Sequence, residues 1–355
     1  MSHDVALAPF PLLSISRFPV RRMVVRADGL LQERFGTMFA KIARMSVAIV
    51  FTAAGFSATS SSAHARQEKN LHKEGIAMPS PVRSGHIEVS GVNYYFAVYG
   101  KGEPLLLLHG GLGSIEMFGP VLTMLAEQRQ VIGVDLHGHG RTALGDRAIS
   151  LIDIGDDMEV LLTRLGYEQV DVLGYSFGGG VAFRLAVQHP AKVRRLVVAS
   201  AGYAQDGFYP EMLPMQAQVG AAMAEAMKET PMYVSYARVA PNPAEFPKLL
   251  DRMGELMRKP YDWSEDVKKL RMPVMLVFGD SDMYRPEHIV KFYQLLGGGL
   301  KDAGWMRENM SQNRLAILPD LTHYEVFSAP ALATTVLPFL NGEGGSKSWA
   351  EQVGR

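Results

Sequence analysis

The chain contains no cysteine. This absence excludes disulfide bonds, a cysteine nucleophile and thiolate metal sites, but it does not exclude export, because a large domain is stable without disulfides. Basic and acidic residues balance at 36 each, so the formal net charge is zero. The sequence therefore offers no broad charged surface for nucleic acid or for an anionic membrane.

A long hydrophobic run is also missing near the N-terminus. The apolar stretch Met45–Ala58 is short and rich in alanine, glycine and serine, which favours a secretory signal peptide over a transmembrane span. Lys41 and Arg44 precede this stretch, and Ala63-His64-Ala65 follows it in the form of an A-x-A cleavage site. We expect export after cleavage near Ala65, with no stable membrane insertion of the mature chain. If the segment is not a signal, the protein stays in the cytoplasm.

The remaining chain, 47% hydrophobic in overall composition, is long enough to bury a sizeable core. The predicted segments are an upstream or disordered extension (1–37), the signal peptide (38–65), a polar linker (66–81), a core in two parts (82–203 and 271–341), a helical cap (204–270) and a flexible tail (342–355).

Apolar strand patterns alternate with helical patterns along the core. After a hairpin at 86–99, continuous apolar runs occur at 104–111, 130–140, 169–176, 193–200, 272–280 and 313–320. Helical patterns occupy 115–128, 151–165, 177–189, 286–296 and 325–340. Continuous apolar strands between helices predict a mostly parallel sheet buried on both faces, an α/β fold.

One interval breaks this alternation, between the sixth and seventh predicted strands. Residues 204–270 read as several short, methionine-rich helices, whereas a plain crossover needs only one helix. We predict that they form an inserted helical cap, since methionine side chains fill irregular apolar gaps. Most of these methionines are expected to be the packed underside of the cap.

The pentapeptide Gly174-Tyr175-Ser176-Phe177-Gly178 has the form G-x-S-x-G. Because a buried-strand pattern precedes it and a helical pattern follows, Ser176 is predicted on a sharp strand-to-helix turn, at the positive end of the helix. A serine hydroxyl there is a candidate nucleophile, but it needs a base.

The chain supplies a base and an acid downstream of the serine. His323 lies just past the last apolar strand, and Asp280 and Asp282 directly follow the preceding strand. Loops at these places reach the carboxyl edge of the sheet, where ligands bind in such folds. A serine, a histidine and an orienting carboxylate together make a nucleophilic triad.

At this point the sequence resembles the α/β-hydrolase superfamily over roughly residues 84–341. The resemblance rests on "LLLLHGGLGS", "VIGVDLHGHGRT", "VLGYSFGGGVA", "MLVFGDSD" and "LPDLTHYEV", which occur in the order of that family. It implies that Ser176 is the nucleophile and His323 the general base. The acid of the family stands three residues after a glycine, which selects Asp282 after Gly279 over Asp280.

The resemblance also implies an oxyanion hole and several structural roles. The backbone N–H of Phe177 and that of Gly111 are the expected donors, with Leu112 as the alternative to Gly111. His109 is expected to hold its loop. His137 and His139 lie in a turn without a cluster of carboxylates, so a structural role is expected for them rather than a metal site.

The sequence therefore predicts a serine hydrolase, carboxylesterase-like, that cleaves an ester or similar acyl bond of a small to medium, fairly apolar molecule without cofactor or metal. A lactonase, a C–C bond hydrolase or a cofactor-free haloperoxidase would use the same residues, and a non-catalytic small-molecule binding protein is a further alternative. Leu112, Tyr203, Met212 and Met215 are the expected substrate contacts. The sequence leaves the oligomeric state open.

Overall fold

The computed structural model describes residues 78–343 and 348–353, all within one compact unit, Ser57–Arg355. The predicted extension (1–37), signal peptide (38–65) and most of the linker (66–81) lie outside the described residues, so those predictions and the export that follows from them stay predictions. Within the described residues, no helix combines the length and apolarity needed to span a membrane.

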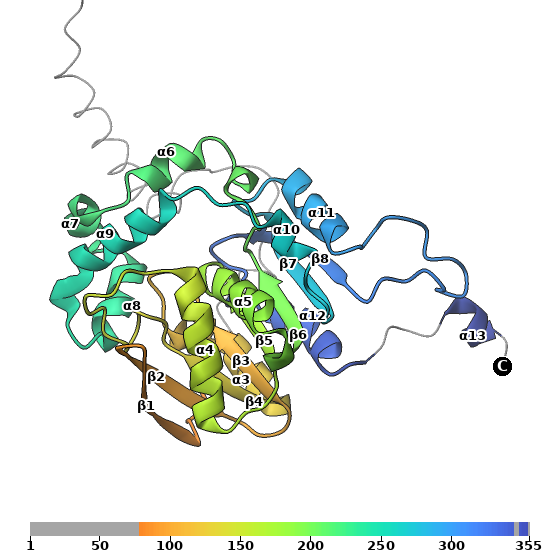
Figure 1. Ribbon diagram of the computed structural model, residues 1–355, viewed down its shortest axis with the longest axis horizontal. Coiled ribbons are helices and arrows are strands. Elements are labelled where there is room, and N and C mark those ends of the chain that lie inside the picture. Colours follow the sequence, from red (N-terminus) through yellow and green to blue (C-terminus); the bar gives the residue numbers. More distant parts are fainter. Residues whose placement is uncertain (1–77, 344–347, 354–355) are drawn as a thin grey trace, which may run out of the picture. The chain divides into compact units, whose positions relative to one another are not determined.

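The described part is built on one sheet of eight strands in the order β1-β2-β4-β3-β5-β6-β7-β8 (Figure 1). The strands are β1 (Arg83–Val89), β2 (Val92–Tyr99), β3 (Pro104–Leu108), β4 (Gln130–Val134), β5 (Val170–Tyr175), β6 (Val193–Ala199), β7 (Val274–Ser281) and β8 (Arg314–Thr322). The pairs β1·β2 and β2·β4 are antiparallel, and every other pair is parallel. The predicted α/β fold with a mostly parallel sheet is therefore confirmed.

Helices cover both faces of this sheet (Figure 1). Those of the core are α3 (Pro120–Gln128), α4 (Leu151–Leu165), α5 (Phe177–Gln188), α11 (Pro286–Leu295) and α12 (Pro330–Leu340), with single turns η1 (Ile115–Phe118) and η2 (Pro190–Lys192). Side chains of α3 and α12 share one apolar cluster with Leu105 and Leu107. Leu106 and Leu108 face the other cluster, with α4, α5 and α11. The continuous apolar run of β3 thus reflects burial on both faces.

The segment between β6 and β7 is helical, as the sequence predicts. It contains η3 (Gln205–Gly207), α6 (Met212–Ala217), η4 (Ala221–Met223), α7 (Ala224–Met227), α8 (Pro231–Val239), η5 (Pro243–Glu245), α9 (Phe246–Met257) and α10 (Ser264–Val267). Phe246, Leu250 and Met253 of α9 are buried in the same apolar cluster as α4 and α5. That this segment acts as a cap over a substrate stays a prediction.

Several predicted segments differ from the structure, and two of them lie near the C-terminus. The helix expected from residue 325 begins at Pro330, because proline fits the first helical position and its preceding residue disfavours helix. The predicted tail contains a short helix, α13 (Trp349–Val353). There Ser348 and Glu351 each accept a hydrogen bond from the backbone N–H of the other, at 3.1 and 2.6 Å. This is the capping box of the sequence pattern S-x-x-E.

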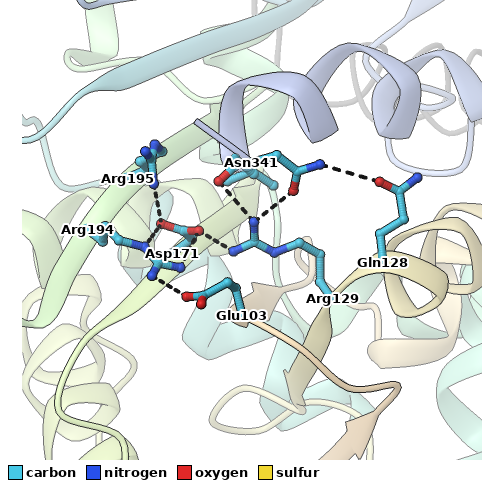
Figure 2. A network of polar contacts seen from close by, with 8 residues as sticks. Glu103, Gln128, Arg129, Asp171, Arg194, Arg195 and Asn341 are labelled. Atoms are coloured by element: carbon cyan, nitrogen blue, oxygen red, sulfur yellow. Dashed lines mark hydrogen bonds and ion pairs between the residues drawn. The ribbon is translucent and has the colours of Figure 1, made fainter. Parts of the chain in front are cut away.

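Figure 2 shows a buried ionic network around Asp171 and Arg129. It lies near the amino ends of the parallel strands, whereas Ser176 follows the carboxyl end of β5. Asp171, fully buried near the start of β5, accepts from Arg129 and from the Nε and Nη2 atoms of Arg194, both at 2.9 Å. Arg129 also donates to the carbonyl oxygen of Leu340 at 2.9 Å, which ties the end of α12 to the sheet. Glu103 joins only at the exposed rim, through Arg194.

This network gives a stability prediction. Asp171→Ala should lower the free energy of unfolding by about 3–5 kcal/mol, because it leaves the buried Arg129 guanidinium without its counter-ion. Urea titration measures the loss. Glu103→Gln is the matched control: its side chain is 65% exposed, and its pair should contribute less than about 1 kcal/mol. Equal losses for both variants would contradict this account of the network.

Candidate active site

Ser176 occupies a strained turn between β5 and α5. Its φ is 52°, a conformation that side chains with a Cβ adopt only where the surroundings force it. A Cβ on Gly174 would lie 2.1 Å from the carbonyl oxygen of Gly178, and one on Gly178 would lie 2.4 Å from that of Leu108. Glycine is therefore required at both positions, and the turn presents the half-buried Ser176 at the positive N-terminus of α5.

His323 contacts Ser176, although the two residues are 147 positions apart in the sequence. It directly follows β8, and its Nε2 lies 3.0 Å from the Ser176 Oγ. The hydroxyl of Tyr175, the residue before the serine, donates to the backbone oxygen of His323 at 2.5 Å. The strand that carries the nucleophile candidate thus also holds the histidine loop in place.

Asp282 completes a hydrogen-bonded row behind the imidazole. It follows the end of β7, is 6% exposed, and its Oδ1 lies 3.0 Å from the His323 Nδ1. A carboxylate only accepts, so Nδ1 carries the proton and the Nε2 lone pair faces the Ser176 hydroxyl. Asp280, by contrast, is exposed and accepts from the backbone N–H of Asp320 at 3.1 Å. The structure thus brings Asp282, and not Asp280, to the histidine.

The two expected oxyanion donors lie beside the serine. A Cβ added at Gly111 would be 3.8 Å from the Cβ of Phe177, so the two backbones approach closely. Among the described residues, neither backbone N–H has a hydrogen-bond partner. Both donors are therefore free to bind a charge that develops on a substrate oxygen. Leu112, the alternative donor, has a φ of 58° in the same loop.

The histidines of the two loops beside the serine are structural in their contacts. His109 donates from Nδ1 to the Gly110 oxygen at 2.7 Å and accepts at Nε2 from the Leu136 N–H at 2.9 Å, so it joins the ends of β3 and β4. His139 is fully buried and stacks on the Phe177 ring at 5.2 Å. Burial lowers the pKa of His139 to about 3, so its ring is neutral. Among the described residues, no cluster of three potential metal ligands is found.

The expected substrate contacts have different surroundings. Leu112 is half-buried in the loop after Gly111, and Met212 and Met215 of α6 are half-buried and exposed, respectively. The ring of Tyr203 is buried: it stacks on His288 at 4.1 Å and packs edge-on against Phe292. Met253 of α9, which the sequence reasoning did not single out, lies beside the proposed oxyanion loop, with its Cε 3.2 Å from a Cβ added at Gly111.

Ser200 is a second residue that the sequence reasoning missed. It lies one residue past β6, and its Oγ donates to the Asp282 Oδ2 at 2.6 Å. No sequence motif marks it. The signal that could have found it is topological, because the carboxyl ends of adjacent parallel strands meet at one edge of the sheet.

Comparison with known proteins agrees with this fold. Residues 103–230 match the family model described as the alpha/beta hydrolase fold. The described residues therefore have the α/β-hydrolase fold. One solved structure of similar fold is a thermophilic esterase from Thermogutta terrifontis, with a TM-score of 0.58 and 19% identity over 74% of this chain and 99% of that one.

The curated relatives match over shorter stretches. An uncharacterized protein of Mycobacterium tuberculosis is 37% identical over 114 residues, 32% of this chain and 33% of that protein. The 2-hydroxymuconate semialdehyde hydrolase of a Pseudomonas strain is 38% identical over 128 residues, 35% of this chain and 45% of the enzyme. The chain therefore spans between a third and a half of the length of these relatives.

The buried His139 gives a prediction on pH. The unfolded chain binds a proton at this residue as pH falls below about 6.5, whereas the folded protein does so only near its pKa of about 3. Stability is therefore lost as pH falls through this window. His139→Phe should reduce the slope of unfolding free energy against pH by up to about 1.4 kcal/mol per unit, measured by urea titration from pH 4 to 6. His86→Phe, on an exposed position of β1, is the control, and an unchanged slope in His139→Phe would refute the prediction.

Proposed function

We propose that this protein cleaves an ester or similar acyl bond of a small to medium, fairly apolar substrate through an acyl-enzyme on Ser176. The observation that carries the proposal is the row Ser176 Oγ, His323 Nε2, His323 Nδ1 and Asp282 Oδ1, with 3.0 Å at each of its two hydrogen bonds. The similarity to an esterase and to a 2-hydroxymuconate semialdehyde hydrolase is compatible with such a row.

Acylation follows from this geometry. The Nε2 lone pair of His323 takes the proton of the Ser176 hydroxyl as the oxygen attacks the substrate carbonyl. Asp282 stabilises the imidazolium and keeps its orientation. The N–H groups of Phe177 and Gly111 stabilise the oxyanion, a contribution of about 10²–10³ in rate for each donor in comparable sites. His323 then returns the proton to the leaving alcohol, and the acyl group stays on Ser176.

Deacylation uses the same groups in reverse order. Water replaces the alcohol beside His323, which removes a proton from the water as it attacks the acyl carbonyl. The Ser176 oxygen leaves with the proton and the carboxylic acid is released. Leu112 and Met253, which border the oxyanion loop, support an apolar acyl or alcohol group. Dehalogenases and epoxide hydrolases of this fold use an aspartate as the nucleophile, whereas residue 176 of this chain is a serine.

A C–C bond hydrolase is the second candidate, because the 38% identical stretch belongs to a 2-hydroxymuconate semialdehyde hydrolase. It would use the same serine, histidine and aspartate on a dicarbonyl substrate. An activity screen that includes esters of graded acyl length and a ring-cleavage dienoate distinguishes the two: ester turnover without dienoate turnover supports the proposal, and the reverse supports the alternative.

Hydrolysis of p-nitrophenyl acetate tests the nucleophile. Ser176→Ala should lower kcat/KM by about 10⁴-fold or more, since the remaining groups cannot form an acyl-enzyme. A fluorophosphonate probe should label the wild-type protein at Ser176 and leave the variant unlabelled. Folded wild-type protein that neither hydrolyses esters nor reacts with the probe would instead favour a non-catalytic binding protein.

The two aspartates after β7 give a matched pair of variants. Asp282→Asn should lower kcat by about 10³–10⁴-fold, because an amide cannot stabilise the imidazolium and can fix the wrong tautomer. Asp280→Asn, two residues away, changes a carboxylate that accepts from the Asp320 N–H and the Ser281 hydroxyl, and it should keep kcat within about twofold. Comparable losses in both variants, measured with the same ester, would remove Asp282 from its proposed role.

A further inference from the structure

The carboxylate of Asp282 accepts three hydrogen bonds, from three parts of the chain. Its Oδ1 accepts from the His323 Nδ1 at 3.0 Å and from the Met283 N–H at 2.7 Å. Its Oδ2 accepts from the Ser200 hydroxyl at 2.6 Å. Two short bonds on different oxygens fix the plane of a carboxylate, which one bond cannot do. The orientation of the Asp282 carboxylate therefore depends on the Ser200 hydroxyl as well as on the N–H of the adjacent Met283.

Ser200 reaches this carboxylate from an unfavourable backbone conformation. Its φ is 50°, in the left-handed region that disfavours every residue except glycine. It is fully buried, and its N–H donates to the Val277 oxygen of β7 at 2.8 Å. Glycine would fit this backbone without strain but has no hydroxyl. Within the described residues, the only hydrogen bond of the Ser200 side chain is the one to Asp282. The unfavourable backbone conformation thus occurs at a residue whose hydroxyl contacts this carboxylate.

The titratable and charged groups near Asp282 determine how much the Ser200 hydroxyl contributes to stabilising this carboxylate. The titratable groups near Asp282 include Tyr175, Tyr284 and Tyr324, and burial raises the pKa of each of these phenols, so they stay neutral. The electrostatic interaction with Glu325, the neighbour of Tyr324, also raises the pKa of Tyr175. Within the described residues no lysine or arginine forms an ion pair with Asp282. Within this part of the chain, the hydrogen bonds that Asp282 accepts come from the Ser200 hydroxyl, the Met283 N–H and the His323 ring.

We propose that Ser200 is a positioning residue of the reaction: its hydroxyl sets the orientation of Asp282 and shares its negative charge, so that His323 faces Ser176 in the correct tautomer. This inference rests on the proposed function for its kinetic consequence, and on the contacts of Asp282 for its structural one. Ser200 acts through Asp282 and does not touch the reacting atoms.

Two substitutions at this position separate positioning from stability. Ser200→Ala removes the hydroxyl and keeps the strained Cβ, and Ser200→Gly removes both. Both should lower kcat for p-nitrophenyl acetate about tenfold with KM unchanged, the loss expected for one hydrogen bond to a charged group. Ser200→Gly should nevertheless have a Tm equal to or above that of Ser200→Ala. Ser90→Gly is the matched control, because Ser90 also has a φ of 50° but lies in the β1–β2 turn; its kcat should not change.

The pH profile provides a measurement that a merely structural role would not alter. Without the Ser200 hydroxyl, the charge on Asp282 is shared less and stabilises the imidazolium more. The acid limb of kcat/KM should therefore move to higher pH in both Ser200 variants and stay in place in Ser90→Gly. A loss of kcat that follows Tm, with an unmoved acid limb, overturns the proposal, and so does an unchanged kcat.

The proton between His323 and Asp282 gives a test that needs no turnover. The downfield ¹H NMR signal of the His323 Nδ1–H should shift in Ser200→Ala relative to the wild type and vanish in His323→Ala, which assigns it. If the wild type hydrolyses no ester but this signal shifts, the proposed function fails while the positioning role holds. If esters are hydrolysed and the signal does not move, the positioning role fails alone.

Discussion

The site depends on one backbone constraint, the turn that holds Ser176 at a φ of 52° between β5 and α5. The hydroxyl stands above the carboxyl edge of the sheet only because the chain reverses there within one residue. That reversal requires glycine at 174 and 178, where any side chain would collide with a backbone oxygen. It also places the Phe177 N–H at the helix terminus, beside Gly111. The nucleophile candidate and one expected oxyanion donor, the Phe177 N–H, thus depend on the same turn.

The partners of Ser176 arrive at this edge through the topology of the sheet. Strands β5, β6, β7 and β8 are parallel neighbours, so the residues that follow them, at 176, 200, 282 and 323, come together although they are far apart in sequence. At the other edge, the pairing of Asp171 with Arg129 and Arg194 fixes the strand starts. Buried charges thus lie at one edge of the sheet, where they hold the strand starts, and the polar side chains of the proposed active site lie at the other.

Much of this architecture can be predicted from the sequence because the physical signals are local. Apolar runs of strand length and the glycines around Ser176 are visible without any structure, and the resemblance to the α/β-hydrolases orders the rest. The choice between Asp280 and Asp282 needed that resemblance, since both follow the same strand. Ser200 and Met253 could not be predicted as site residues, because their contacts with Asp282 and with Gly111 depend on which neighbouring element they face. The start of α12 and the capping box of α13 were missed despite signals in the sequence, Pro330 and the pattern Ser348 to Glu351.

The central claim is that the Ser176 oxygen forms the covalent bond to the substrate. Acid quenching of the protein during hydrolysis of p-nitrophenyl acetate, followed by mass spectrometry of its peptides, tests this claim directly. The account predicts an acetyl group on the peptide that contains Ser176, accumulated within the first turnover and absent in Ser176→Ala. Ester hydrolysis with no adduct at this serine, or with an adduct on another residue that is needed for turnover, would contradict it.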